Sequence, residues 1–405
     1  MLKSILSMIM VRGLTLVFPL ILIPLQIKLL GINQYGYYNV LLAFGAIASV
    51  IVNFGFDYTV SRNISRVYDD RELVSHYYSV AMISKAILFL TVSIVIISIF
   101  AYRGEIKNSI GVIIFCSSQV IMPVYLFQGI RKMGYLVYNT IFLNFSFCIF
   151  LFYLISLGEQ ITSGHLYTGY AIINLMSALL MTWIIYKKLN VRLSKVEFKD
   201  VNLQLKDGLW IFFSRLMSMG LSQLSIILLS SLLNPTLLGI YSLADKLVRA
   251  ANSIFYAFQQ ATYPYFCNNA SRKNFLTLTI ILVIIAAVGV FTLLLAKDII
   301  LRFFPELSSN FMTVMIMFSS LIPMALSGML GVNFLLAQDH NRPFAISLCV
   351  GALWNIIMLK YYVTSNSLKE AALTLVSTEV VVVLAMLISI TLIMRKKDDK
   401  RIKND

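Results

Sequence analysis

The chain contains few charged residues, and acidic residues are especially scarce. Of 405 residues, only 18 are Asp or Glu, and charged residues of both signs make up 13%. Soluble globular proteins carry charge on about a quarter of their residues. Hydrophobic residues make up 59% of this chain, and its mean hydropathy is +0.84. The composition therefore excludes a soluble globular protein and indicates a membrane protein with several spans.

Cysteine and histidine, which supply many metal sites and nucleophiles, are also rare. The cysteines lie in or at the edges of apolar runs, without the spacing of metal ligands: Cys116, Cys148, Cys267 and Cys349. The histidines lie near the ends of expected helices, without a partner at catalytic spacing: His76, His165 and His340. The sequence therefore predicts no disulfide framework, no metal site and no cofactor.

Long apolar runs are what the chain has in abundance. Crossing about 30 Å of hydrocarbon takes roughly 18 to 25 helical residues, and runs of that length recur along the whole sequence. No connection between them is long enough to hold a soluble domain. We predict an all-α polytopic membrane protein with about twelve transmembrane helices. The expected spans are 8–30, 38–57, 77–101, 109–130, 137–157, 166–186, 208–233, 239–265, 275–296, 311–337, 344–364 and 370–394.

The net charge is +15, and the positions of the basic residues along the chain indicate the topology. Most lysines and arginines lie in alternate connections, with the largest groups in residues 187–206 and in the tail at 395–405. Cytoplasmic connections carry an excess of Lys and Arg, so both termini are expected in the cytoplasm. The basic residues lie at helix ends rather than on one folded surface, so we expect membrane lipids and not nucleic acid as partners.

A faint internal repeat suggests that the two halves of the sequence are related. A shift of 203 positions superimposes Arg215 on Arg12, Gly239 on Gly36 and Tyr241 on Tyr38. We therefore expect two six-helix bundles of the same orientation, related by a pseudo-two-fold axis along the membrane normal. The predicted organisation is an N-terminal bundle over 1–190, a cytoplasmic linker over 191–206, a C-terminal bundle over 207–394 and a basic cytoplasmic tail over 395–405.

Arg249 is the deepest charged residue within the expected spans, close to the membrane midplane. Asp245 lies four residues earlier on the same helical face, where it can pair with Arg249. Charged side chains at this depth are costly, and they face a water-filled cavity or each other. We predict Arg249 and the neighbouring Lys246 as substrate-binding residues, and Asp245 as a counter-ion or ion-coupling residue.

Other charged residues in the spans leave more than one role open. Arg12, Arg215 and Lys85 either bind a substrate or snorkel to the interface, and the matched register of the two arginines favours substrate binding. Glu379 lies deep in the last span and is a candidate protonated carboxyl, counter-ion or member of a proton path. Asp57 lies at a helix end, where we expect it at the interface.

The excess of positive charge inside the membrane predicts an anionic passenger. Guanidinium groups bind phosphate oxygens through paired hydrogen bonds. A phosphorylated lipid would bring such a group into the membrane while its chain stays among the bilayer lipids. The charged residues therefore favour a transporter of a phosphorylated lipid.

Several segments together resemble one known family. They are 24–31 (PLQIKLLG), 35–38 (YGYY), 53–56 (NFGF), 238–246 (LGIYSLADK) and 263–264 (YP). In this order they resemble the Wzx-type polysaccharide flippases of the multidrug/oligosaccharidyl-lipid/polysaccharide exporter superfamily. The resemblance implies a V-shaped pair of six-helix bundles around a central cavity. It also implies alternating access and translocation of an undecaprenyl-diphosphate-linked repeat unit, such as that of O-antigen in lipopolysaccharide.

The resemblance carries further expectations. It implies a bacterial cytoplasmic (inner) membrane protein of surface polysaccharide biosynthesis, with a polysaccharide polymerase and a chain-length regulator as partners. The cavity arginines of the family map onto Arg12 and Arg215, with Arg249 as a further cationic candidate. Family members often carry an acidic residue in the middle of the seventh helix, where this chain has 220–225 (GLSQLS). Ion coupling through that acid is therefore in doubt, and Asp245 and Glu379 are the alternatives.

Two other functions remain as alternatives. A cation-coupled multidrug exporter of the same superfamily would need more buried carboxylates than buried basic groups, and the balance here is the reverse. A membrane glycosyltransferase or polymerase needs a sizeable extramembrane loop with catalytic groups. The outward connections are short, the longest running over about residues 297–310. The sequence therefore predicts a transporter and not an enzyme.

Overall fold

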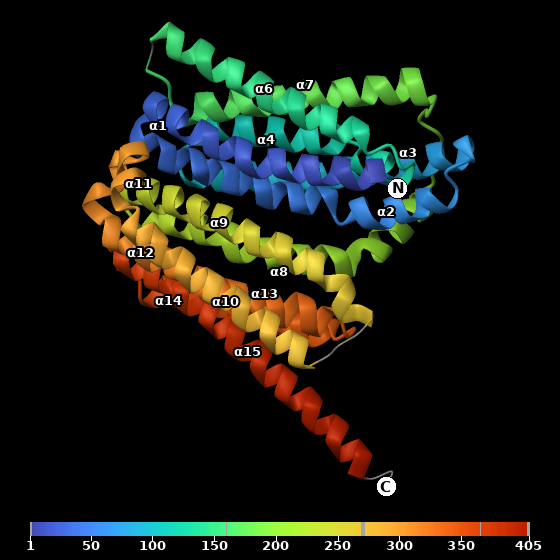
Figure 1. Ribbon diagram of the computed structural model, residues 1–405. Helices are drawn as coiled ribbons and strands as arrows, with labels where there is room; N and C mark the ends of the chain where they lie inside the picture. Colours follow the sequence, from blue (N-terminus) through green and yellow to red (C-terminus); the bar gives the residue numbers. More distant parts are fainter. Residues whose placement is uncertain (1, 159, 269–271, 365, 403–405) are drawn as a thin grey trace. The chain divides into compact units, whose positions relative to one another are not determined.

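The computed structural model describes residues 2–158, 160–268, 272–364 and 366–402, and the regular secondary structure in these residues is helical (Figure 1). The described side chains exclude those of 2–19, 214, 218, 220–222, 261, 264, 268, 272 and 396–402. The side chain of Arg12, one of the predicted substrate-binding residues, therefore lies outside the described residues.

The longer elements are α1 (Leu2–Asn53), α2 (Phe56–Arg66), α3 (Arg71–Tyr102), α4 (Ile106–Ile121), α5 (Val124–Gly129), α6 (Gly134–Leu157), α7 (Ser163–Ile184), α8 (Phe198–Leu232), α9 (Pro235–Asn268), α10 (Arg272–Leu295), α11 (Lys297–Phe303), α12 (Phe311–Ser319), α13 (Leu321–Gly328), α14 (Asn341–Tyr361) and α15 (Leu368–Ile402). Three short π or 3₁₀ segments join them: η1 (Ile185–Leu189), η2 (Pro305–Asn310) and η3 (Met329–Leu336).

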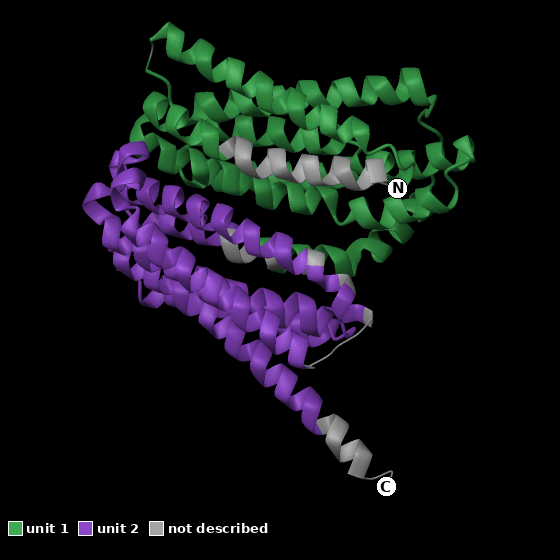
Figure 2. Cartoon of the chain, viewed as in Figure 1, with its two compact units in different colours: residues 1–219 green, residues 220–405 purple. Residues whose placement is uncertain are grey.

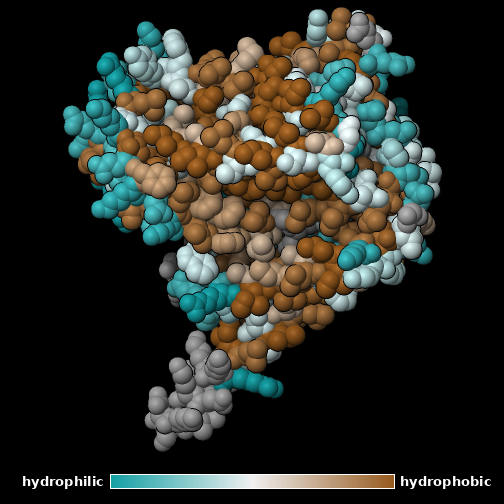
Figure 3. All heavy atoms as spheres, turned by 180° about the vertical axis from the view of Figure 1, so that it is seen from behind, coloured by the Kyte–Doolittle hydropathy of each residue, from teal (hydrophilic) through white to brown (hydrophobic). Residues whose placement is uncertain are grey.

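The predicted all-α, multi-span membrane architecture is confirmed. In the described part of the chain, 9 helical stretches are long and apolar enough to cross a membrane. The first of them, Leu20–Arg66, contains the second expected span and the last part of the first, and α8 and α9 coincide with the seventh and eighth. The twelve expected spans therefore all fall on helices. On the face in Figure 3, hydrophobic residues cover most of the middle and hydrophilic residues gather toward the left and right edges.

The chain divides into two compact units, residues 1–219 and 220–405 (Figure 2). In the first unit, α4 packs along α7, and α1 contacts α4, α6 and α7. A second part of its core lies where α2 packs against α5. The residues buried there include Phe56, Val60, Ile64, Tyr125, Leu126 and Phe127. This cluster packs around the end of α1 and the start of α2. Asp57 lies in the first turn of α2.

The first part of α8 belongs to the first unit, although we expected residues up to 206 to form a linker. The helix begins at Phe198. The Gln204 amide donates to Thr59 Oγ1 over 2.9 Å, and the Phe212 ring stacks on Phe54 with centroids 4.4 Å apart. A Cβ on Gly208 would lie 2.8 Å from the Phe54 carbonyl oxygen, so glycine permits this close approach. The six-helix division at residues 190 and 207 stays a prediction.

In the second unit, α14 packs along α15, and α13 contacts α9 and α10. Buried apolar residues from η3 and α15 form its core, including Leu330, Leu335, Val382, Val383 and Met386. A buried polar chain crosses the unit, because Ser225 Oγ donates to Asn355 Oδ1 and the Asn355 amide donates to Thr378 Oγ1. These bonds fix α8, α14 and α15 within the unit, beside the part of α15 that carries Glu379.

Candidate functional site

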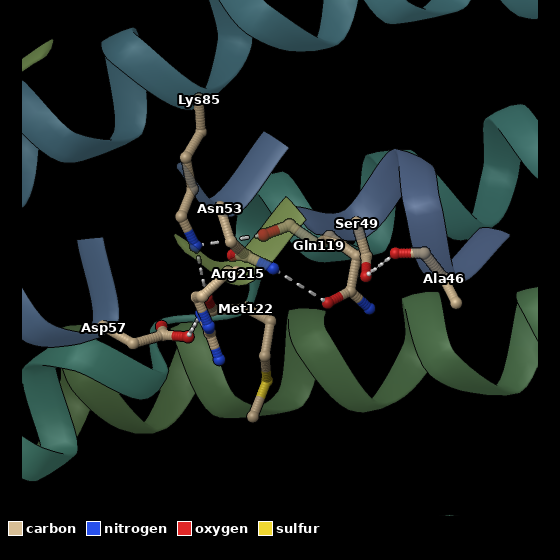
Figure 4. Close-up of polar contacts among 8 residues, drawn as sticks. All are labelled: Ala46, Ser49, Asn53, Asp57, Lys85, Gln119, Met122 and Arg215. Carbon is tan, nitrogen blue, oxygen red and sulfur yellow. Dashed lines mark hydrogen bonds and ion pairs between the residues drawn. The ribbon is translucent and has the colours of Figure 1, made fainter. Parts of the chain in front are cut away.

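Arg215 on α8 pairs with Asp57 on α2. The Arg215 Nη1 donates to Asp57 Oδ2 over 3.1 Å, and the guanidinium also lies over the Tyr58 ring, 5.3 Å from its centroid. The two side chains are 36% and 17% exposed. Figure 4 shows the Asp57 carboxylate and the Arg215 guanidinium in contact. Asp57, which we expected at the interface, is therefore the counter-ion of a predicted substrate-binding arginine.

Lys85 on α3 is fully buried, which contradicts the alternative that it snorkels to the interface. Its Nζ donates to the carbonyl oxygens of Gln119 over 3.1 Å and Met122 over 3.2 Å (Figure 4). Pro123 separates α4 from α5 and has no N–H to offer the Gln119 carbonyl four residues earlier. The ammonium therefore takes the place of the missing backbone donor, and it also lies 4.8 Å from the centroid of the Tyr125 ring.

The same junction includes the end of α1. The Asn53 amide lies 3.5 Å from Gln119 Oε1, so the side chain of Gln119 contacts α1 while its backbone contacts Lys85. Asp57 lies within electrostatic range of Lys85. The first unit therefore brings two basic groups and one acid together at the meeting point of α1, α2, α3, α4 and α8.

The second unit carries the other charged cluster. The Arg249 Nε donates to Asp245 Oδ2 over 2.7 Å, which confirms the predicted pairing four residues apart on α9. Arg249 is 39% exposed and Asp245 only 4%. Glu379 on α15 acts electrostatically on both members of the pair, and Asp245 acts on Lys246. The cluster thus contains two basic and two acidic groups.

The two arginine–aspartate pairs share one geometry. Each aspartate contacts its arginine through a single oxygen, and the other oxygen, Oδ1 of Asp57 or of Asp245, is buried without a hydrogen-bond partner among the described residues. A guanidinium has five N–H donors in a rigid fork. Donation through one nitrogen leaves a second edge of each half-exposed arginine with the geometry that suits a phosphate or a carboxylate.

The sequence-based site is therefore divided between the units. Arg215 and Lys85 lie in the first unit, and Arg249, Lys246, Asp245 and Glu379 lie in the second. Sequence reasoning missed Asp57 as a partner of Arg215, because 158 positions separate the two residues and no local spacing links them. No group of three or more His, Cys, Asp or Glu side chains suited to a metal ion occurs within the described residues.

The sequence of the chain is similar to those of proteins of polysaccharide biosynthesis. Residues 1–270 match the family model described as Polysaccharide biosynthesis protein. A protein of Escherichia coli (strain K12), provisionally named an O-antigen transporter, is 22% identical over 398 residues, which is 95% of each chain. A protein of Shigella dysenteriae with the same provisional name is 26% identical over 266 residues, covering 65% of this chain and 66% of that protein.

Solved structures share the fold. An inward-facing multidrug resistance MATE family transporter of the MOP superfamily aligns with a TM-score of 0.65 at 15% identity, covering 91% of this chain and 94% of that one. The lipid II flippase MurJ in an inward closed conformation aligns with a TM-score of 0.59 at 14% identity, covering 88% of this chain and 85% of that one. The chain therefore has the MATE-like fold.

Proposed function

Because the chain belongs to the polysaccharide biosynthesis protein family, we propose that it carries a lipid-linked oligosaccharide repeat unit across the bacterial cytoplasmic membrane. The passenger is an undecaprenyl-diphosphate-linked glycan of the O-antigen kind, moved from the cytoplasmic to the outer leaflet by alternating access. The names of the two relatives support this substrate class, and the similarity in fold to transporters supports a transporter rather than an enzyme.

The observation that carries the proposal is the state of the two arginines. Arg215 and Arg249 are half-exposed, and each is held by only one carboxylate oxygen. A diphosphate offers several anionic oxygens, which a guanidinium binds through two parallel hydrogen bonds. We propose that Arg215 and Arg12 in the first unit, and Arg249 in the second, each bind the diphosphate during transport, with Lys246 as a further cationic group of the second unit. The prenyl chain stays in the surrounding lipid.

Lys85 has an indirect role, although its charge alone would suggest that it binds the passenger. Its ammonium is buried and bound to two backbone carbonyls, so it stabilises the break between α4 and α5. We propose that it acts on the passenger indirectly, through Asp57 and Arg215. Asp245 and Glu379 serve as counter-ions of Arg249, and either is a candidate for ion coupling.

The distribution of basic residues supports an orientation. The stretch 187–206 is the most basic internal part of the chain, and it runs into the first turns of α8, the helix that carries Arg215. Under the positive-inside rule this stretch and both termini lie in the cytoplasm, where the repeat unit is assembled on its lipid. A polysaccharide polymerase and a chain-length regulator are proposed partners, because they would act on the delivered repeat units.

The proposal is tested by replacing each arginine in cells that depend on this protein for surface polysaccharide. Arg215→Ala and Arg249→Ala should abolish the polysaccharide even when the amount of protein in the membrane is matched to that of the wild type. Arg302→Ala, which removes an exposed arginine on α11, should leave it intact. Wild-type amounts of polysaccharide in both cluster variants would rule the proposal out, whereas loss in all three would indicate a general effect of lost charge.

A further inference from the structure

The polar junction of the first unit contains an acid that no substrate role requires. Asp57 lies on α2 and pairs with the half-exposed Arg215, and the fully buried Lys85 belongs to the same junction. Of its two carboxylate oxygens, Oδ2 accepts the Arg215 hydrogen bond, and Oδ1 is buried without a hydrogen-bond partner among the described residues. A buried carboxylate oxygen without a donor is costly. The arrangement is therefore incompletely satisfied as it stands.

Lys85 is the candidate for the missing donor. An ammonium has three N–H groups, and two of those of Lys85 are used by the carbonyls of Gln119 and Met122. The third is not used by another protein oxygen in the described structure, and Asp57 is within electrostatic range. In Figure 4 the Lys85 side chain extends from α3 toward the region where the side chains of Asp57 and Arg215 meet.

We propose that Asp57 is a releasable counter-ion that occupies Arg215 in the empty protein and moves to Lys85 when a lipid diphosphate binds Arg215. This inference rests on the proposed function, since it assigns Arg215 to the diphosphate. In the empty protein Asp57 neutralises the arginine that would otherwise be left unpaired. In the loaded protein the diphosphate takes that place, and Lys85 keeps the released carboxylate from being buried without a partner.

The exchange has a functional consequence. A cationic site without a counter-ion would bind the diphosphate tightly and release it slowly, because nothing would compete with the departing passenger. Asp57 competes for the same guanidinium, so it weakens binding and helps release on the far side of the membrane. A ligand shifts such an equilibrium only by its different affinity for the two states, and the competing ion pair supplies that difference.

The test measures binding of farnesyl diphosphate, a short-chain lipid diphosphate, to the purified full-length protein in detergent. Asp57→Asn keeps the shape and removes the competing charge, so its Kd should fall about fivefold, the effect expected of one partly exposed ion pair. Surface polysaccharide should fall at the same time, because release slows. Asp69→Asn makes the same chemical change in the exposed loop before α3 and should alter neither quantity.

Lys85→Met gives the second arm of a double-mutant cycle. In the wild-type background it should raise the Kd, because the released Asp57 has no partner. In the Asp57→Asn background it should have little effect, because there is no carboxylate to receive. Equal effects in the two backgrounds, or an unchanged Kd in Asp57→Asn, would overturn the inference.

Two further outcomes keep this test separate from that of the proposed function. If the wild-type protein fails to bind farnesyl diphosphate, the proposed function and the inference both fail. If it binds and Arg215→Ala abolishes binding while Asp57→Asn changes nothing, only the inference fails. Should Asp57→Asn fail to accumulate, Asp57→Glu retains the charge on a longer side chain, and its Kd should stay near wild type. A fivefold fall there would contradict the role of charge.

Discussion

Gly31 and Asn234 interrupt the helical path at corresponding places in the two halves of the chain. Gly31 has φ 70° and ψ 162° within α1, and Asn234 lies between α8 and α9, where its side chain accepts the Leu237 amide. The two positions match under the 203-residue shift that relates Tyr38 to Tyr241, and both tyrosines are buried. The repeat detected in the sequence therefore extends to the positions of the helix breaks.

The break at Gly31 should be sensitive to a side chain for conformational reasons alone. A Cβ there would meet nothing within 4 Å, but its φ lies in a region that only glycine adopts readily. Gly31→Ala should therefore destabilise the protein by about 1–3 kcal/mol. The apparent Tm in detergent measures this. Gly289→Ala, in the middle of α10 and also without contacts at its Cβ, should be neutral or slightly stabilising. Equal Tm values for both variants would contradict the account.

The buried Lys85 should matter to stability because of the break at Pro123. Lys85→Met leaves the carbonyls of Gln119 and Met122 without their donor and should cost about 1–3 kcal/mol. Pro123→Ala restores a backbone N–H that can pair with the Gln119 carbonyl, so the same lysine change should cost less in that background. Unfolding in denaturant measures both. The cost of Lys107→Met, at an exposed site on α4, should stay within about 0.5 kcal/mol.

The ion pair of Arg249 and Asp245 on α9 predicts that a second substitution, at Asp245, restores the stability lost in Arg249→Ala. Arg249→Ala leaves Asp245 buried without its counter-ion, and because Arg249 is 39% exposed the cost should be about 1–2 kcal/mol. Adding Asp245→Asn removes the unpaired charge and should return the membrane level of the protein toward wild type. The double variant should still lack surface polysaccharide. Quantitative immunoblotting gives the first result, and recovery of polysaccharide in the double variant would exclude Arg249 from the passenger site.

The orientation can be tested with single cysteines in a protein whose four native cysteines are replaced. Lys195→Cys lies in the basic connection before α8, and Ser308→Cys lies in η2, within the connection expected to face outward. A membrane-impermeant maleimide should label the second in intact spheroplasts and the first only after permeabilisation. The opposite pattern would invert the proposed topology.

Local sequence patterns were enough to predict several features. The apolar runs located the helices, because a membrane span has a fixed minimum length. The spacing of Asp245 and Arg249 predicted their ion pair, because residues four apart share one face of a helix. Both predictions depend only on residues close together in the sequence.

Features set by packing between distant segments could not be predicted in this way. Asp57 and Arg215 are 158 positions apart, and the sequence around each residue does not indicate that the two side chains form an ion pair. Lys85 looked like a substrate-binding or snorkelling lysine, because its charge is visible in the sequence and the carbonyls freed by Pro123 are not. The first part of α8 looked like a linker because it is polar, yet Gln204 and Gly208 pack it against the residues around Phe54 and Thr59.

We propose that the protein moves a lipid diphosphate and that its half-exposed arginines bind this group. The direct measurement uses proteoliposomes that carry a fluorescent undecaprenyl-diphosphate-linked sugar, with dithionite quenching to report movement between leaflets. The wild-type protein should accelerate movement well above that in empty liposomes, and Arg249→Ala and Arg215→Ala should reduce it to that background. Movement in wild-type vesicles equal to that in empty liposomes, or full activity in both arginine variants, would contradict the account.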